Sequence, residues 1–188
     1  LTSLISGSHH AAIGTESMNN ATTANNNTAV SGYDGMYSLT TGSDNSGLGY
    51  AIMYSITTGG YNTALGSLAL WSNSTGNYNT AIGYRSLRDA AGSGNVALGY
   101  FSGRYETGSD AFYVNNKDLT NSAGDKAGSL LYGTFNATPS LQTLTINGKV
   151  GIGTTNPYAP LTVRSTSAGA YAEGINLDIN NSTTGSAI

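Results

Sequence analysis

A short sequence recurs about every 17 residues between His10 and Asn95, and few folds accommodate a repeat of this length. Successive copies are spaced by 17, 18, 17, 17 and 16 residues. The copies start at His10, Asn27, Asn45, Asn62, Asn79 and Asn95, and we expect a degenerate seventh start at Asp110. Such a unit is too short for a pair of helices, but it can form one coil of a β-solenoid that rises about 4.8 Å per coil.

Each copy alternates small and large residues, which predicts a short strand. Two residues after the start lies a small residue, namely Ala12, Ala29, Gly47, Ala64, Ala81 or Ala97. Three residues after it lies an aliphatic residue, namely Ile13, Val30, Leu48, Leu65, Ile82 or Leu98. A further apolar position holds Met18, Met36, Met53, Leu70 and Leu87, provided that Ser31 is an inserted residue in a β-bulge. We expect the aliphatic residues inside the coil and the small residues on its outer face.

A single chain of this kind has little apolar surface with which to offset the entropy lost on ordering each coil. The small residues Ala12, Ala29, Gly47, Ala64, Ala81 and Ala97 would let another chain approach closely. We therefore expect a homo-oligomer whose chains pack side by side through these residues.

The repeat ends near Asp110, and the remaining chain predicts separate strands. They are Phe112–Val114, Leu130–Tyr132, Leu141–Ile146, Lys149–Ile152 and Leu161–Arg164. The pair Asn147 and Gly148 favours a two-residue hairpin turn. We expect three regions: a β-solenoid over residues 1–110, a β neck or collar with this hairpin over 111–164, and a linker with the start of a further fibre segment over 165–188. The last region includes a strand pattern at Ile175, Leu177 and Ile179.

Composition excludes several classes of function. The net charge is −3 with only 7 lysines and arginines, which disfavours nucleic-acid binding. The chain has no cysteine, so it has neither disulfides nor a cysteine-based zinc site. It also has no run of 18 apolar residues, so we expect no membrane insertion.

Two segments resemble a known class of proteins. Residues 60–66 (Gly-Tyr-Asn-Thr-Ala-Leu-Gly) and 76–84 (Gly-Asn-Tyr-Asn-Thr-Ala-Ile-Gly-Tyr) resemble repeats of bacteriophage tail fibres and of trimeric surface adhesins with YadA-like heads. Residues 150–157 (Val-Gly-Ile-Gly-Thr-Thr-Asn-Pro) are similar to a segment common in tail-fibre proteins, where it often precedes a self-cleaving chaperone. The resemblance implies an elongated, all-β homotrimeric fibre, with a solenoid followed by an interwoven β neck.

The sequence offers few candidates for catalysis or metal binding. In a three-fold rod His9 and His10 could ring an axial metal or anion, but His10 can equally replace the Asn of the repeat, which we favour. Candidates for paired catalytic carboxylates are Asp89, Glu106, Asp110, Asp118, Asp125 and Glu173. Nothing in the sequence brings two of them together, and we expect most acidic residues to be solvated caps in turns. We predict no enzyme activity, no cofactor and no metal.

The aromatic residues are more informative, because they recur in register. The candidate residues for stacking on sugar rings are Tyr33, Tyr37, Tyr50, Tyr54, Trp71, Tyr84 and Tyr100. Stacked coils would align them in ladders along the rod, either exposed for glycans or packed for stability.

The leading hypothesis is a structural and receptor-binding component of a phage tail fibre, located outside the cell on the virion tail. It would attach to a host-surface glycan or protein by multivalent binding. The alternatives are a bacterial trimeric surface adhesin or extracellular filament on the cell surface, and then a glycan-degrading tailspike.

Overall fold

The computed structural model describes residues 6–163 as two compact units, the first ending at Asn147 and the second beginning at Gly148. The predicted linker over 165–188 and its strand around Leu177 lie outside the described residues. Each unit is considered by itself below.

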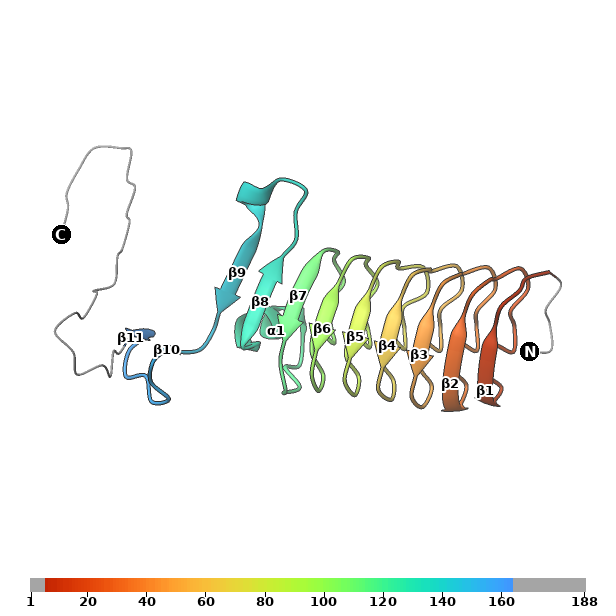
Figure 1. Ribbon diagram of the computed structural model, residues 1–188, viewed down its shortest axis with the longest axis horizontal. Coiled ribbons are helices and arrows are strands. Elements are labelled where there is room, and N and C mark those ends of the chain that lie inside the picture. The colour runs from red at the N-terminus through yellow and green to blue at the C-terminus, as the bar shows by residue number, and fades with distance from the viewer. Residues whose placement is uncertain (1–5, 164–188) are drawn as a thin grey trace. The chain divides into compact units, whose positions relative to one another are not determined.

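Seven short parallel strands form most of the first unit. They are β1 (Ala11–Thr15), β2 (Thr28–Tyr33), β3 (Ser46–Leu48), β4 (Thr63–Leu65), β5 (Thr80–Ile82), β6 (Val96–Leu98) and β7 (Ala111–Val114). Each strand pairs only with its sequence neighbours, and a loop from every strand returns to the start of the next (Figure 1). This arrangement confirms a β-solenoid of stacked coils, one for each sequence repeat.

The pairing register fixes where the repeat is irregular. Ile13 pairs with Val30 but Thr15 pairs with Tyr33, so β2 carries one extra residue, as the bulge at Ser31 predicted. The seventh copy starts at Ala111 rather than at the expected Asp110, because the Ala111 N–H donates to Asn95 as the earlier starts do to their neighbours.

The recurring asparagines form a buried ladder that explains the frame of the repeat. Each Nδ2 donates to a glycine carbonyl in the turn that follows, at 2.9 to 3.0 Å. The pairs are Asn27 with Gly42, Asn45 with Gly59, Asn62 with Gly76, Asn79 with Gly92 and Asn95 with Gly108. Each Oδ1 accepts from the backbone N–H of the next start. One side chain thus joins its own turn to the adjacent coil, and a buried polar group is satisfied.

The two faces of the strands are oriented opposite to our prediction. Ala29, Ala64, Ala81 and Ala97 are at most 3% exposed and belong to the chain's own core, together with the buried Gly47, whereas Ala12 is half-buried. The large core residues come from the opposite wall, including Met36, Ile52 and Leu70. A Cβ on Gly47 would lie 3.0 Å from Ile52, so only small side chains fit beneath the strands. The expectation that these small residues contact another chain is therefore wrong.

The aliphatic residues consequently form a column on the outer face of the sheet. Ile13, Leu48, Leu65, Ile82 and Leu98 are 36% to 61% exposed. Strand pairing continues this column from Leu98 through Val114 and Leu131 to Ile146. Nine aliphatic side chains thus lie in hydrogen-bonded register across the whole sheet, with Val30 as the remaining member. We call this set the aliphatic column.

The C-terminal end of the solenoid is closed by antiparallel strands and a helix. β8 (Leu131–Thr134) pairs with β7, and β9 (Thr143–Ile146) pairs with β8, with a 3-10 turn at Pro139–Leu141 between them. The helix α1 (Ser122–Gly128) lies between β7 and β8 in sequence, and was not predicted. Residues 111–147 therefore continue the solenoid sheet instead of beginning a separate neck.

The second unit contains a short parallel pair, β10 (Val150–Ile152) with β11 (Leu161–Val163). The predicted hairpin at Asn147 and Gly148 is wrong, because β9 and β10 belong to different sheets. Asn147 instead donates its Nδ2 to the carbonyl of Ser129 at 2.8 Å, and the unit boundary follows it.

Candidate functional site

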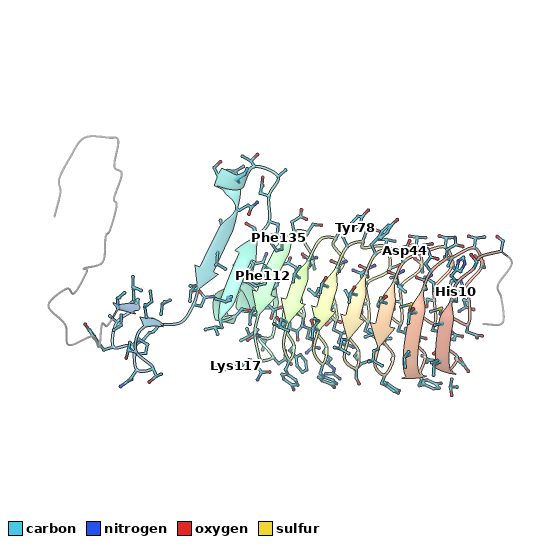
Figure 2. The ribbon with its side chains drawn as sticks, in the orientation of Figure 1. His10, Asp44, Tyr78, Phe112, Lys117 and Phe135 are labelled. Carbon is cyan, nitrogen blue, oxygen red and sulfur yellow. The ribbon has the colours of Figure 1, made fainter. Side chains whose placement is uncertain are left out.

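Aromatic side chains gather along three lines of the solenoid, each parallel to the direction of stacking. The end edge comprises the residues at or just after the end of each strand, and carries Tyr33, Tyr50, Tyr84 and Tyr100. The back wall is the wall of the coil opposite the strands, which includes Met36, Ile52 and Leu70, and it carries Tyr37, Tyr54 and Trp71. The start edge comprises the residues just before each ladder asparagine, and carries Tyr61 and Tyr78; Figure 2 shows Tyr78 on this edge, with Lys117 on the opposite one.

The end edge has two stacked pairs separated by a gap. Tyr33 and Tyr50 have ring centroids 6.1 Å apart, and Tyr84 and Tyr100 have centroids 5.6 Å apart. Ser67 occupies the intervening coil, so the ladder is interrupted there. The four rings are 38% to 52% exposed.

The back wall has an unbroken stack. Tyr37, Tyr54 and Trp71 follow one another at 5.4 and 5.6 Å between ring centroids. The Arg88 guanidinium lies 4.8 Å above the Trp71 ring and ends the row with a cation–π contact. These rings are all half-buried.

Stacking limits which rings have a face for a ligand. A ring with neighbours on both faces presents only its edge, so Tyr54 and Trp71 have no free face. Of the seven predicted glycan-stacking residues, the structure thus leaves an open face mainly to those at the ends of a stack, such as Tyr50 beside Ser67, whereas Tyr84 stacks on Tyr100 and has the Arg85 guanidinium 5.0 Å from its ring centroid. The alignment in ladders is confirmed, but no ligand contact is tested by it.

The sequence prediction missed the most exposed aromatic pair of the solenoid. Tyr61 and Tyr78 stack at 5.1 Å with an interplanar angle of 10°, and they are 56% and 64% exposed. Their spacing of one repeat was the available signal. Both have a positive φ of 59°, which turns their side chains out at the corner of the coil.

His10 replaces the asparagine of the repeat, which is the alternative that we favoured from the sequence. His10 occupies the asparagine position of its coil, and its Nε2 lies 2.9 Å from the carbonyl oxygen of Ala24, which imitates the bond from asparagine to glycine. His9 contacts the Ser8 hydroxyl at 2.9 Å. Within residues 6–163, no group of three or more His, Asp and Glu side chains is placed to hold a metal ion.

Two of the candidate carboxylates, Glu106 and Asp125, are buried and are exceptions to the expectation that most acidic residues are solvated caps. Glu106 accepts hydrogen bonds from the Tyr113 hydroxyl and from the Gly108 N–H, and lies 3.4 Å from the Lys126 ammonium. Burial alone would raise the pKa of Glu106, but these three partners together lower it below its usual value. Glu106 and Tyr113 thus close the end of the core.

Asp125 of α1 is fully buried and accepts from the Tyr105 N–H at 2.9 Å. Burial raises the pKa of Asp125 to about 6, opposed by the Tyr105 bond and reinforced by the charge of Asp118. The bond ties α1 to the last coil, so its role is structural.

Two of the remaining candidates, Asp89 and Asp118, are brought together through Arg104. Asp89 forms ion pairs with Arg88 at 2.7 Å and with Arg104 at 3.1 Å, and Arg104 also pairs with Asp118 at 2.9 Å. Asp110 lies on the start edge, and Glu173 lies outside the described residues. These contacts are those of a charged surface network at the end of the solenoid.

Comparisons with known protein families, with curated proteins and with solved structures found no match. In the described part of the chain, no helix is long and apolar enough to cross a lipid bilayer. The aromatic edges and the aliphatic column are therefore the features on which a function has to be argued.

Proposed function

We propose that this chain is a structural and receptor-binding segment of a bacteriophage tail fibre, which works as a homotrimer on the outside of the virion. The aliphatic column carries the proposal. Nine aliphatic side chains in line across nine strands span about 40 Å at the usual strand spacing, and in a lone chain six of them are exposed to water, while Val30, Val114 and Leu131 are half-buried.

Hollows on the outer face of the sheet support packing against another chain. A hollow of about 350 Å³ lies beside the column residues Val30, Leu48 and Leu65. Its other lining residues are Thr28, Ser46, Gly47, Thr63 and Ala64. A second hollow of about 590 Å³ adjoins Leu98, Val114 and Leu130. A sister chain presents an apolar column with the same spacing, so the two can interlock over their full length. Three-fold symmetry follows the sequence resemblance to trimeric fibres.

Attachment by such a fibre would depend on many weak contacts. Each chain presents aromatic rings at regular spacing on both edges of the sheet, and a trimer presents every site three times. Binding several copies at once increases the overall affinity without any new contact. Aromatic faces favour a glycan receptor on the host surface.

The assembly is tested by sedimentation equilibrium of the full chain. We expect three times the 19.2 kDa of one chain, with dissociation when Leu65→Asp and Ile82→Asp are combined. Thr58→Asp, in an exposed turn away from the column, is the matched control and should leave the trimer intact. A folded wild-type monomer would contradict the proposal.

Receptor binding is tested separately by labelling the full chain and measuring its attachment to bacterial cells and to surface polysaccharide purified from them. We expect saturable binding that is stronger for the trimer than for the dissociated variant. Absence of attachment across a broad panel of strains would contradict receptor binding and leave only the role of a spacer within the fibre.

A further inference from the structure

The start edge of the solenoid holds a ring, Tyr78, with only one face stacked on another aromatic ring among the described residues. In successive coils this line carries Asp44, Tyr61, Tyr78, Gly94 and Asp110, as the backbone bonds from Tyr78 to Gly60, from Gly94 to Asn77 and from Asp110 to Ser93 define. Tyr61 stacks on one face of Tyr78. The coil on the other side of Tyr78 provides only Gly94, which has no side chain to cover the second face.

A carboxylate lies directly beside this open face. A Cβ built on Gly94 would lie 2.3 Å from Oδ1 of Asp110, so the Asp110 side chain is directed back toward Gly94 and the preceding coil. Asp110 is exposed, and among the described residues its carboxylate has no ion pair and no hydrogen-bond donor. The hydroxyl of Ser93, the residue before Gly94, already accepts a hydrogen bond from the Asn77 N–H at 3.0 Å.

A flat apolar face with a free acceptor at its side matches the chemistry of a sugar ring. One face of a pyranose consists of C–H groups that pack on an aromatic ring, while its hydroxyls donate to carboxylates. The line carries two carboxylates, Asp44 and Asp110, and no cation, so it would repel an acidic sugar. Figure 2 shows Asp44 and Tyr78 together on this edge.

We propose that Tyr78, Gly94 and Asp110 form a binding site for a neutral pyranose ring of a surface glycan. The sugar stacks on the second face of Tyr78, which has no aromatic neighbour within residues 6–163, and a hydroxyl donates to the Asp110 carboxylate that lies against Gly94. This inference rests on the proposed function, because it assigns the receptor class and the position of contact.

The test uses the full chain on an array of neutral, sialylated and uronic oligosaccharides, followed by calorimetric titration with the neutral oligosaccharide that binds best. Tyr78→Ala and Asp110→Asn should each weaken binding about five- to tenfold, and Tyr78→Phe, which keeps the ring, should bind nearly as well as wild type. Gly94→Asn tolerates the positive φ of 69° and should also weaken binding, because its side chain displaces the Asp110 carboxylate and lies beside the Tyr78 ring. Tyr158→Ala, which removes an exposed aromatic ring away from the solenoid edges, is the matched control and should leave the affinity unchanged, while Tyr84→Ala tests the end edge separately.

The outcomes separate this site from the broader proposal. If neutral sugars bind but Tyr84→Ala abolishes binding while the Tyr78 and Asp110 variants do not, this site is wrong and a glycan-binding fibre stands. Preference for sialylated or uronic sugars overturns the neutral class. No binding of wild-type protein to any saccharide overturns both this site and glycan attachment. Circular dichroism of each variant verifies the fold, and the exposed Asp110→Asn and Tyr78→Phe changes keep the test valid if Tyr78→Ala unfolds.

Discussion

At the scale of the residue, one buried amide per coil sets the position of everything around it. Asn62 donates Nδ2 to the Gly76 carbonyl at 2.9 Å, and its Oδ1 accepts from the Asn79 N–H at 2.9 Å. The same side chain therefore fixes a turn and the offset between two coils. A buried polar group that is fully paired also disfavours alternative registers, because any slip leaves its partners unsatisfied.

We predict that Asn62→Ala lowers the free energy of unfolding by about 2 to 4 kcal/mol, because it leaves the Gly76 carbonyl and the Asn79 N–H without partners. Urea denaturation at a fixed protein concentration measures the change. Thr58→Ala, in an exposed turn, should alter it by less than about 0.5 kcal/mol. Equal effects of the two variants would refute the role of the ladder.

A second prediction concerns Gly83, which has a φ of +131° and whose Cβ would lie 2.3 Å from the carbonyl oxygen of Gly99. Gly83→Ala should therefore destabilise the protein by about 3 kcal/mol or more, since a rigid backbone atom has to move. Gly32→Ala is the matched control, because nothing lies within 4 Å of its Cβ. Similar melting temperatures for the two variants would show that the coils can separate easily.

At the scale of the element, the helix α1 acts as a cap whose strength depends on pH. Its Asp125 has a raised pKa of about 6 when folded, against 3.8 as the ordinary value. A carboxyl whose folded pKa is raised stabilises the fold when it is protonated. That contribution is complete below pH 4 and is lost as the pH rises through about 6.

We therefore predict that Asp125→Asn, which keeps an acceptor for the Tyr105 N–H, raises stability at pH 7.5 relative to wild type by on the order of 1 to 3 kcal/mol. The advantage should shrink as the pH falls from about 6 to 4. Melting curves recorded at several pH values measure it. The lowered pKa of Glu106 has the opposite sign, so comparing the variant with wild type isolates Asp125. An advantage independent of pH would contradict the assignment.

The sequence was sufficient for elements whose signal is local and insufficient for those that depend on packing. Repeat spacing predicted the strands, the bulge at Ser31 and the ring ladders. Alternation alone could not tell which face of the strand is inside, and the answer depended on Ile52 and other large residues of the opposite wall. The Asn147–Gly148 signal is typical of a hairpin, but the strands on either side pair elsewhere. The free face of Tyr78 depends on Gly94, the residue aligned with it in the next coil. Only the stacking register shows that these two residues are neighbours.

At the scale of the whole molecule, the chain divides after Asn147, and the two units should differ in resistance to proteolysis. The solenoid has a continuous core and paired strands throughout, whereas the second unit has one short strand pair in the described residues. Arg88 and Arg104 of the solenoid lie in ion pairs, while Lys149 is exposed.

We predict that limited trypsin digestion cleaves at Lys149 well before Arg88 or Arg104, and yields a solenoid fragment that keeps its β-sheet circular dichroism. Mass spectrometry over a time course identifies the fragment. If the aliphatic column mediates assembly, this fragment should also retain the oligomeric state of the full chain. Early cleavage at Arg88 would indicate that the last coils open more readily than the boundary.

The repeated ladder bond between coils has a consequence for inheritance. The ladder bonds join residues 16 to 18 apart in adjoining coils, and the same pair of groups makes the bond at each junction. An in-frame duplication or loss of one such stretch would therefore lengthen or shorten the stack by one rung while every surface stays aligned. Gain or loss of a coil can thus change the length of the stack, because the ladder bond at each junction stays the same.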